Sequence, residues 1–203
     1  MQGNTAVGLV MATYLEAQPF IESMPMEEEG RRPFRVFRGG DIILVISGIG
    51  KTNAAVAASY LIMQYNVTVI YNAGAAGAVI AGIQLGDIFH IKKVVEYDRP
   101  KMSGGGMRFV TPSVMEGHET AVLATQDVPV ISGEFRSRVS EHAALVDMEG
   151  AAVVHACGLY AIPCYLFKIV SDTVSDQNGR NIVENIAAVR NDLYSYMVEH
   201  VLG

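Results

Sequence analysis

The stretch Lys168-Ile169-Val170-Ser171-Asp172 ends in a carboxylate directly after an apolar run, and Val146-Asp147-Met148-Glu149-Gly150 has the same pattern upstream. Short apolar runs of this kind predict strands that are buried on both faces. A carboxylate at the end of a buried strand costs stability unless it is paired or hydrated, so its position indicates a function. In open α/β sheets, ligands bind at this edge, where the strands end.

Strands and helices alternate along the rest of the chain. Gly39-Gly40 lies between two strand-like runs and predicts a hairpin. Loops are expected at 27–30, where the charge run predicts a solvated segment, at 72–78, and at 98–117, which predicts a mobile segment. The alternation predicts an α/β fold with three αβα layers, a central, largely parallel mixed sheet, and one domain over residues 1–203.

Composition restricts the functional classes. The chain has 203 residues, of which 50% are hydrophobic and 18% are charged, with a net charge of −6. These values are typical of a globular protein and disfavour a nucleic-acid surface. No apolar run approaches the roughly 20 residues that span a bilayer. Cys157 and Cys164 are expected to be free buried thiols, which favours a cytoplasmic location, and no Cys/His spacing predicts a metal site.

Two glycine-rich segments resemble nucleotide-binding motifs only superficially. Gly48-Ile49-Gly50-Lys51-Thr52 lacks the earlier glycine of a P-loop, because Val45 occupies that position. It is instead interpreted as a strand–turn–helix joint. The loop expected at 72–78 is not a Gly-x-Gly-x-x-Gly fingerprint. Its small residues are compatible with close approach of a ligand and equally with packing of a helix.

Three acids follow predicted strands. Taken alone, Glu16 is compatible with a first-turn helix acid, Glu149 with a helix start, and Asp172 with a cap. Taken together, they lie at strand–loop junctions of one predicted sheet, and such junctions converge in space. The sequence therefore predicts one site that contains all three carboxylates.

The ordered motifs resemble the purine nucleoside phosphorylase-like superfamily. The resemblance is closest to its nucleosidase branch, which includes 5′-methylthioadenosine/S-adenosylhomocysteine nucleosidases and futalosine hydrolases. It covers essentially the whole chain and is weakest over 98–142. The motifs that carry it, in order, are Ser47–Ala55, Asn72–Gly77, Gly86-Asp87-Ile88, Val146–Glu149 and Ser171-Asp172.

The resemblance implies a role for each matching residue. Asp172 corresponds to the acid that protonates N7 of the leaving purine, and Ser171 would orient it. Glu149 corresponds to the acid that holds the ribose hydroxyls, with Met148 against the sugar. Glu16 matches the acid that orients or deprotonates the attacking water.

The chemistry agrees with this division of roles. Cleavage of an N-glycosidic bond builds positive charge on the sugar and negative charge on the base, so an acid at the base and carboxylates near the sugar stabilise both ends. A free aspartate is almost fully ionised at neutral pH. The proton on Asp172 must therefore be retained by burial and neighbouring carboxylates, or must arrive with the substrate. Both routes remain open.

Departures from the family pattern bear on the nucleophile. The phosphorylases hold phosphate with arginines and a hydroxyl residue, where this chain has Asn72 and Ala75. An oxyanion has little to bind it without these groups, so water is the favoured nucleophile. Lys168 stands where the family commonly has arginine, which brings the positioning of Asp172 into question.

The base side of the site also differs. Residues 125–142 are shorter than in the common methylthioadenosine enzymes, which suggests a different 5′ substituent. The backbone near Val130 would lie beside the base, and Gly77 belongs to the small-residue segment that lets a ligand approach. Asp127 is interpreted either as a contact to the base or as a surface acid.

The expected protein is a nucleosidase that hydrolyses a purine nucleoside, of adenine type and with a modified 5′ group, using water and no metal or organic cofactor. A phosphate-dependent phosphorylase and a non-catalytic nucleoside-binding module are the alternatives. The resembling enzymes pair, so a homodimer is expected.

Overall fold

Four parallel strands form the centre of the computed structural model, which describes residues 6–99, 107–130, 133–175 and 181–203. Their order across the sheet is β4, β1, β5 and β10. Because parallel strands end at one edge, loops that are far apart in the sequence meet there. The bounds of these strands are β1 (Val7–Met11), β4 (Ile42–Ile46), β5 (Val69–Ala78) and β10 (Cys164–Asp172).

Further strands complete the sheet on both sides, through antiparallel and parallel pairings. On one side β3 pairs with β4 and β2 with β3. On the other side β5, β10, β6, β8 and β9 pair in turn and return to β5, so these five strands close into a ring. The added strands are β2 (Glu27–Gly30), β3 (Arg35–Gly39), β6 (Ile88–Glu96), β7 (Phe109–Val110), β8 (Thr120–Thr125) and β9 (Leu145–Asp147).

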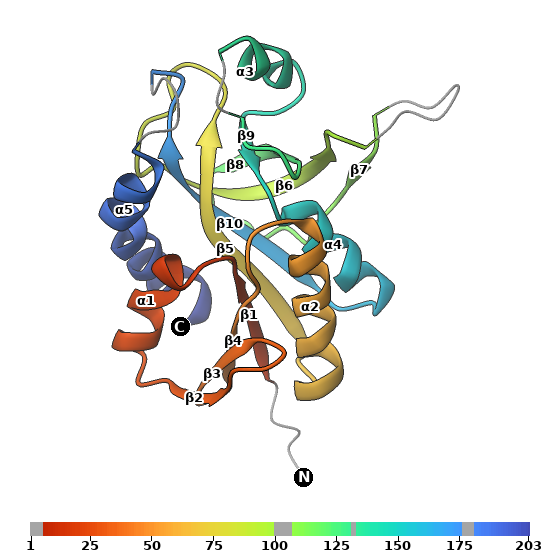
Figure 1. Ribbon diagram of the computed structural model, residues 1–203, viewed down its shortest axis with the longest axis vertical. Coiled ribbons are helices and arrows are strands. Elements are labelled where there is room, and N and C mark those ends of the chain that lie inside the picture. Colours follow the sequence, from red (N-terminus) through yellow and green to blue (C-terminus); the bar gives the residue numbers. More distant parts are fainter. Residues whose placement is uncertain (1–5, 100–106, 131–132, 176–180) are drawn as a thin grey trace.

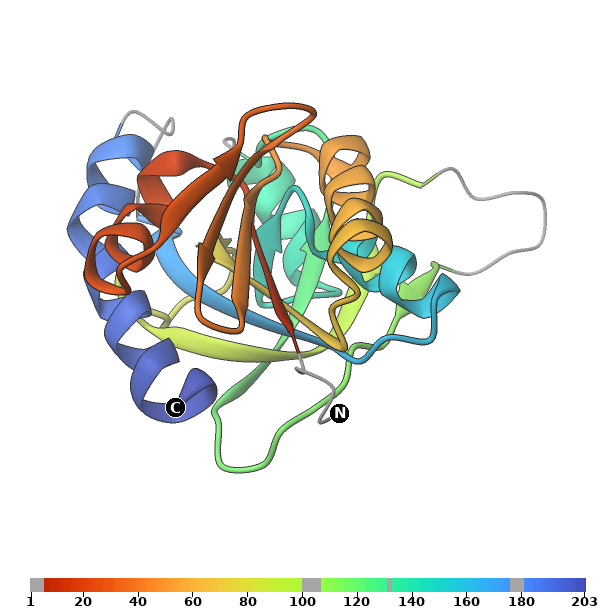
Figure 2. The same cartoon turned by 90° about the horizontal axis from the view of Figure 1, so that it is seen from below.

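Helices cover both faces of the sheet (Figures 1 and 2). Helices α1 and α5 pack on one face over a core that includes Phe20, Phe167 and Leu193. Helices α2 and α4 pack on the other over a core that includes Leu61 and Ile70. The bounds are α1 (Tyr14–Ser23), α2 (Lys51–Tyr65), α3 (Gly133–Ser140), α4 (Gly150–Leu159) and α5 (Ile182–Met197), followed by a π-helical turn (Val198–Leu202).

The predicted fold class is confirmed, and so is the hairpin at Gly39-Gly40, which joins β3 to β4. Two loop predictions are wrong. The acidic segment at 27–30 is the edge strand β2, where Glu28 and Glu29 form ion pairs with Arg35 and Arg38 of β3. Residues 72–78 are the second half of β5, because β10 pairs with most of this stretch, β1 reaches Asn72, and β9 pairs with Gly77 and Ala78.

The segment predicted as a mobile loop, 98–117, is described only in part. Residues 100–106 lie outside the described residues, and 109–110 form β7, which pairs with β6. Within the described part of the chain, no helix combines the length and the apolar character needed to cross a bilayer.

Candidate active site

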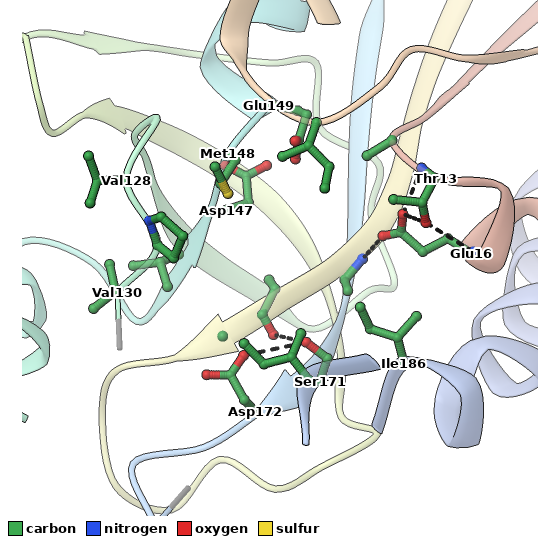
Figure 3. Close-up of a pocket in the computed structure, with 18 residues that line it drawn as sticks. Thr13, Glu16, Val128, Val130, Asp147, Met148, Glu149, Ser171, Asp172 and Ile186 are labelled. Carbon is green, nitrogen blue, oxygen red and sulfur yellow. Dashed lines mark hydrogen bonds between the residues drawn. The ribbon is translucent and has the colours of Figure 1, made fainter. Parts of the chain in front are cut away.

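A pocket lies where β5, β9 and β10 end, and the three predicted acids line it together (Figure 3). Its volume is about 170 Å³, more than ten times what a single water needs, so it has room for a ligand. Nearly every residue predicted for the site lines this pocket: Glu16, Ala75, Gly77, Val130, Met148, Glu149, Ser171 and Asp172. Asp127 does not line it.

Glu16 is fixed by hydrogen bonds from two elements. The Thr13 hydroxyl, at 2.6 Å, and its backbone N–H, at 3.0 Å, donate to Oε2 of Glu16, which closes a capping box at the start of α1. The backbone N–H of Ala75 in β5 donates to Oε1 at 2.8 Å. Glu16 therefore caps the start of α1 and also lines the pocket. The chain uses the backbone of Ala75 to hold an acid at the pocket.

Two glycines of β5 make room for two of the acids. A Cβ atom on Gly74 would lie 2.9 Å from Oε1 of Glu16, and one on Gly77 would lie 2.8 Å from Oδ1 of Asp172. Real Cβ atoms essentially never approach other atoms so closely. The small residues at 72–78 are therefore needed for side chains of the protein itself, which neither interpretation of the sequence had included.

Glu149 lies at the start of α4 and contacts the start of α2. The backbone N–H of Gly50 donates to Oε1 of Glu149 at 2.8 Å. Gly50 has φ of 102°, a conformation that favours glycine, and this turn directs its N–H toward the pocket. Burial, and then the neighbouring charge of Asp147, raise the pKa of Glu149 to about 7. Glu149 therefore changes charge near neutral pH.

The raised pKa of Glu149 predicts a pH-dependent stability. The folded protein binds this proton more tightly than the unfolded chain, so stability falls as pH rises from about 4.5 to about 7. Glutamine cannot ionise, so Glu149→Gln should be more stable than wild type at pH 8, by up to about 3 kcal/mol. The gain should shrink toward pH 4.5, as urea unfolding at both pH values would show.

The matched control for this variant is Glu184→Gln, which changes an exposed acid in the first turn of α5. It should show no pH-dependent gain. Equal stability of wild type and Glu149→Gln at pH 8 would contradict the claim that burial destabilises the ionised form of Glu149.

A buried ion pair holds the segment next to Glu149. Nζ of Lys168 lies 2.9 Å from Oδ2 of Asp147, and both side chains are almost fully buried. Asp147 also accepts the Thr125 hydroxyl at 2.6 Å and the Gly150 N–H at 2.8 Å, which ties β8, β10 and the start of α4 together. Burial lowers the pKa of Lys168, but the carboxylates of Asp147 and Glu149 outweigh this and leave it raised. Lys168 therefore positions the β9–α4 junction rather than Asp172.

Asp172 ends β10, and its carboxylate is held by Arg136 of α3. Nη2 of Arg136 donates to Oδ2 of Asp172 at 2.5 Å, while the Ser171 hydroxyl lies 3.4 Å from Oδ1. That second distance is at the limit of a hydrogen bond, so Ser171 contributes less to the orientation of Asp172 than Arg136 does.

Asp127 is the one predicted site residue that the structure places elsewhere. Its Oδ1 accepts the backbone N–H of Lys51 at 2.9 Å, and its Oδ2 lies 3.7 Å from Nζ of Lys51. The start of α2 therefore binds the carboxylates of Asp127 and Glu149, as expected for the positive end of a helix. Asp127 is therefore an exposed acid that does not line the pocket.

The remaining walls of the pocket are apolar. No lysine, arginine or histidine is among the lining residues that the structure describes. Over the same described ranges, no group of three or more His, Cys, Asp or Glu side chains is arranged to hold a metal ion. The apolar lining consists mainly of Ile49, Val128, Pro129, Met148, Ile182 and Ile186.

A family model described as the phosphorylase superfamily matches residues 6–128 and 118–202. The chain belongs to the phosphorylase superfamily. Two curated relatives in it are named 5′-methylthioadenosine/S-adenosylhomocysteine nucleosidase. The one from Arabidopsis thaliana is 28% identical over 91% of this chain and 86% of its own length. The one from Buchnera aphidicola subsp. Acyrthosiphon pisum (strain Tuc7) is 25% identical over 80% of this chain and 78% of its own.

Solved structures share the superfamily fold. The 5′-methylthioadenosine nucleosidase of Arabidopsis thaliana in its apo form has a TM-score of 0.86 at 23% identity, and covers 96% of this chain and 93% of that chain. Futalosine hydrolase of Helicobacter pylori strain 26695 has a TM-score of 0.84 at 20% identity, and covers 99% and 100%. The resemblance inferred from the ordered motifs is confirmed.

Sequence reasoning within this superfamily missed Arg136. The residue lies in the stretch where the resemblance is weakest, on a short and mostly polar helix. One signal was present, because Arg136 and Val139 are three residues apart and form the buried face of α3. A charged residue on a buried helix face calls for a partner, and here the partner is Asp172.

Proposed function

We propose that this protein hydrolyses the N-glycosidic bond of a purine nucleoside with a modified 5′ group and releases the free base. The proposed nucleophile is water, and the reaction needs neither a metal nor an organic cofactor. The proposal extends to this chain the activity that the curated relatives' names state.

The observation that carries the proposal is the charge of the pocket. Four carboxylates line it (Glu16, Asp147, Glu149 and Asp172), and none of its described lining residues is basic. Phosphate would need cationic donors, but Lys168 and Arg136 are already paired with Asp147 and Asp172 and do not line the pocket. Water carries no charge, and a carboxylate can take its proton. The pocket therefore favours hydrolysis over phosphorolysis.

We assign the roles as follows. Asp172 gives the proton to N7, Glu149 accepts the hydrogen bonds of the ribose hydroxyls, and Glu16 orients or deprotonates the water. Support comes from the position of each acid in the same pocket, on a different element (Figure 3). Met148 would pack against the sugar and Val130 beside the base.

The 5′ group is proposed to be apolar. The pocket is lined by Ile49 and, from α5, by Ile182 and Ile186. No basic side chain among the described lining residues would pair with a charged 5′ substituent. A 5′-alkylthio group would gain about 0.8 kcal/mol for each buried CH₂. We therefore propose a 5′-alkylthioadenosine as the substrate class.

Base release from 5′-methylthioadenosine, measured with and without inorganic phosphate, tests the proposal. The expected rate is the same in both, and the sugar product carries a free C1′ hydroxyl. Strict dependence on phosphate would identify a phosphorylase. Tight nucleoside binding without any cleavage would identify a binding module.

The assembly and location are further parts of the proposal. We propose a homodimer, because Val56 and Met63 of α2 and Leu159 of the adjacent α4 are exposed apolar side chains. Sedimentation should give twice the mass of one chain, and a monomer would rule out the dimer.

We propose one domain in the cytoplasm, where the free thiols of Cys157 and Cys164 would stay reduced.

A further inference from the structure

We propose that Arg136 is a positioning residue for Asp172, and that it favours release of the proton that Asp172 gives to the leaving base. The inference rests on the proposed function, because it assigns another residue to the same reaction. The inference is based on the contact between this buried arginine and Asp172, the proposed general acid, at the edge of the pocket.

The contacts of Arg136 fix it in place. Only 4% of its surface is exposed. Nη1 donates to the carbonyl oxygen of Ala78 at 2.7 Å, and Nη2 donates to Oδ2 of Asp172 at 2.5 Å. The guanidinium thus bridges the ends of β5 and β10. Arg136 does not line the pocket, so it reaches the reaction only through Asp172.

This contact distinguishes the two oxygens of Asp172. Oδ2 accepts from a permanent cation, whereas Oδ1 lies 3.4 Å from the Ser171 hydroxyl. A proton on Asp172 therefore belongs on Oδ1, because Oδ2 already accepts a charged donor. Arg136 thereby selects the oxygen that acts on the base.

The chemical step explains why this cation accelerates the reaction. The bond from C1′ to the base nitrogen breaks, its electron pair stays with the base, and the proton on Oδ1 moves to N7. The water oxygen bonds to C1′, its proton passes through Glu16 to solvent, and solvent reprotonates Asp172. Asp172 becomes a carboxylate in this step. Arg136 binds a carboxylate more strongly than a neutral acid, so its stabilisation grows toward the transition state.

The other charged groups at the pocket do not supply this effect. Glu16, Glu149 and Asp147 also face it, and Asp147 is already paired with Lys168 at 2.9 Å. In the part of the chain that the structure describes, Arg136 is the one cation in contact with Asp172. Arg136 can therefore stabilise the carboxylate that Asp172 becomes when it gives up its proton.

Kinetics of three variants with 5′-methylthioadenosine test the inference. Arg136→Gln should lower kcat by roughly 10- to 100-fold, below the full contribution of a general acid, with KM little changed. Arg136→Lys keeps the positive charge but loses the two-pronged guanidinium geometry, so its kcat should fall less than that of Arg136→Gln.

Arg138→Gln is the matched control, because Arg138 lies exposed on the same helix with its guanidinium over Phe135. It should behave as wild type. An Arg136→Gln enzyme with wild-type kcat would overturn the inference. If that variant does not fold, wild-type kcat in Arg136→Lys would overturn it equally.

Crystal structures of unliganded wild type and Arg136→Gln separate this inference from the proposed function. In Arg136→Gln the carboxylate of Asp172 should turn away from its wild-type position at the edge of the pocket. An Asp172 side chain in the same place in both structures refutes the inference even in an active enzyme. A wild-type protein that releases no base refutes the proposed function, and the structures still decide whether Arg136 positions Asp172.

Discussion

An Asp172→Asn variant should lose most of its turnover, with kcat lower by roughly 10²- to 10⁴-fold, because an amide cannot give the leaving base a proton. In the wild type, Arg136 of α3 pairs with Asp172 of β10. Asparagine keeps a side-chain oxygen that can accept a hydrogen bond from Arg136. The variant should therefore fold. Initial rates of base release from 5′-methylthioadenosine, together with the melting temperature, measure both effects.

The control for this variant is Asp192→Asn, which changes an exposed acid on α5. It should retain wild-type kcat and KM. If Asp172→Asn also retained wild-type turnover, another group would have to protonate the base, and Asp172 would be only the ion-pair partner of Arg136.

A Glu16→Gln variant should lower kcat by roughly 10²-fold or more, because the amide cannot take a proton from water. Glutamine has one acceptor oxygen, so it can accept the N–H of Thr13 or the N–H of Ala75 but not both, and the melting temperature shows how much stability this costs. KM should change little, and steady-state kinetics give the two constants separately.

Glu22→Gln is the matched control, because Glu22 lies exposed on the same helix and accepts a hydrogen bond from Gln18. Its kinetics should equal those of wild type. An unchanged kcat in Glu16→Gln would mean that Glu16 serves only as a helix cap, which is the simpler interpretation that the sequence offered.

The sequence predicted the parts of the fold that rest on local patterns. The continuous apolar runs at β4 and β10 are typical of strands covered on both faces, and both strands lie in the centre of the sheet. Local patterns failed where side chains from elsewhere decide the structure. Residues 72–78 have low strand propensity, yet they continue β5 because β10 pairs with most of them and β9 pairs with Gly77 and Ala78.

The three acids were predictable as a set, since parallel strands bring their ends to one edge. Their partners were not. Gly74 and Gly77 make room for the carboxylates of Glu16 and Asp172, a requirement that exists only after β5 is placed between α1 and β10. Asp127 directly precedes the pocket residues 128–130 in the sequence, but its carboxylate accepts the backbone N–H of Lys51 at the N-terminus of α2 instead of lining the pocket.

The measurement that tests the central claim most directly is a crystal structure of the Asp172→Asn variant with 5′-methylthioadenosine bound. The account predicts the edge of the base at residue 172, the ribose hydroxyls at Glu149, and a water between Glu16 and C1′. A nucleoside bound outside this pocket, or bound with its base at Glu149 and its sugar away from the three acids, would contradict it.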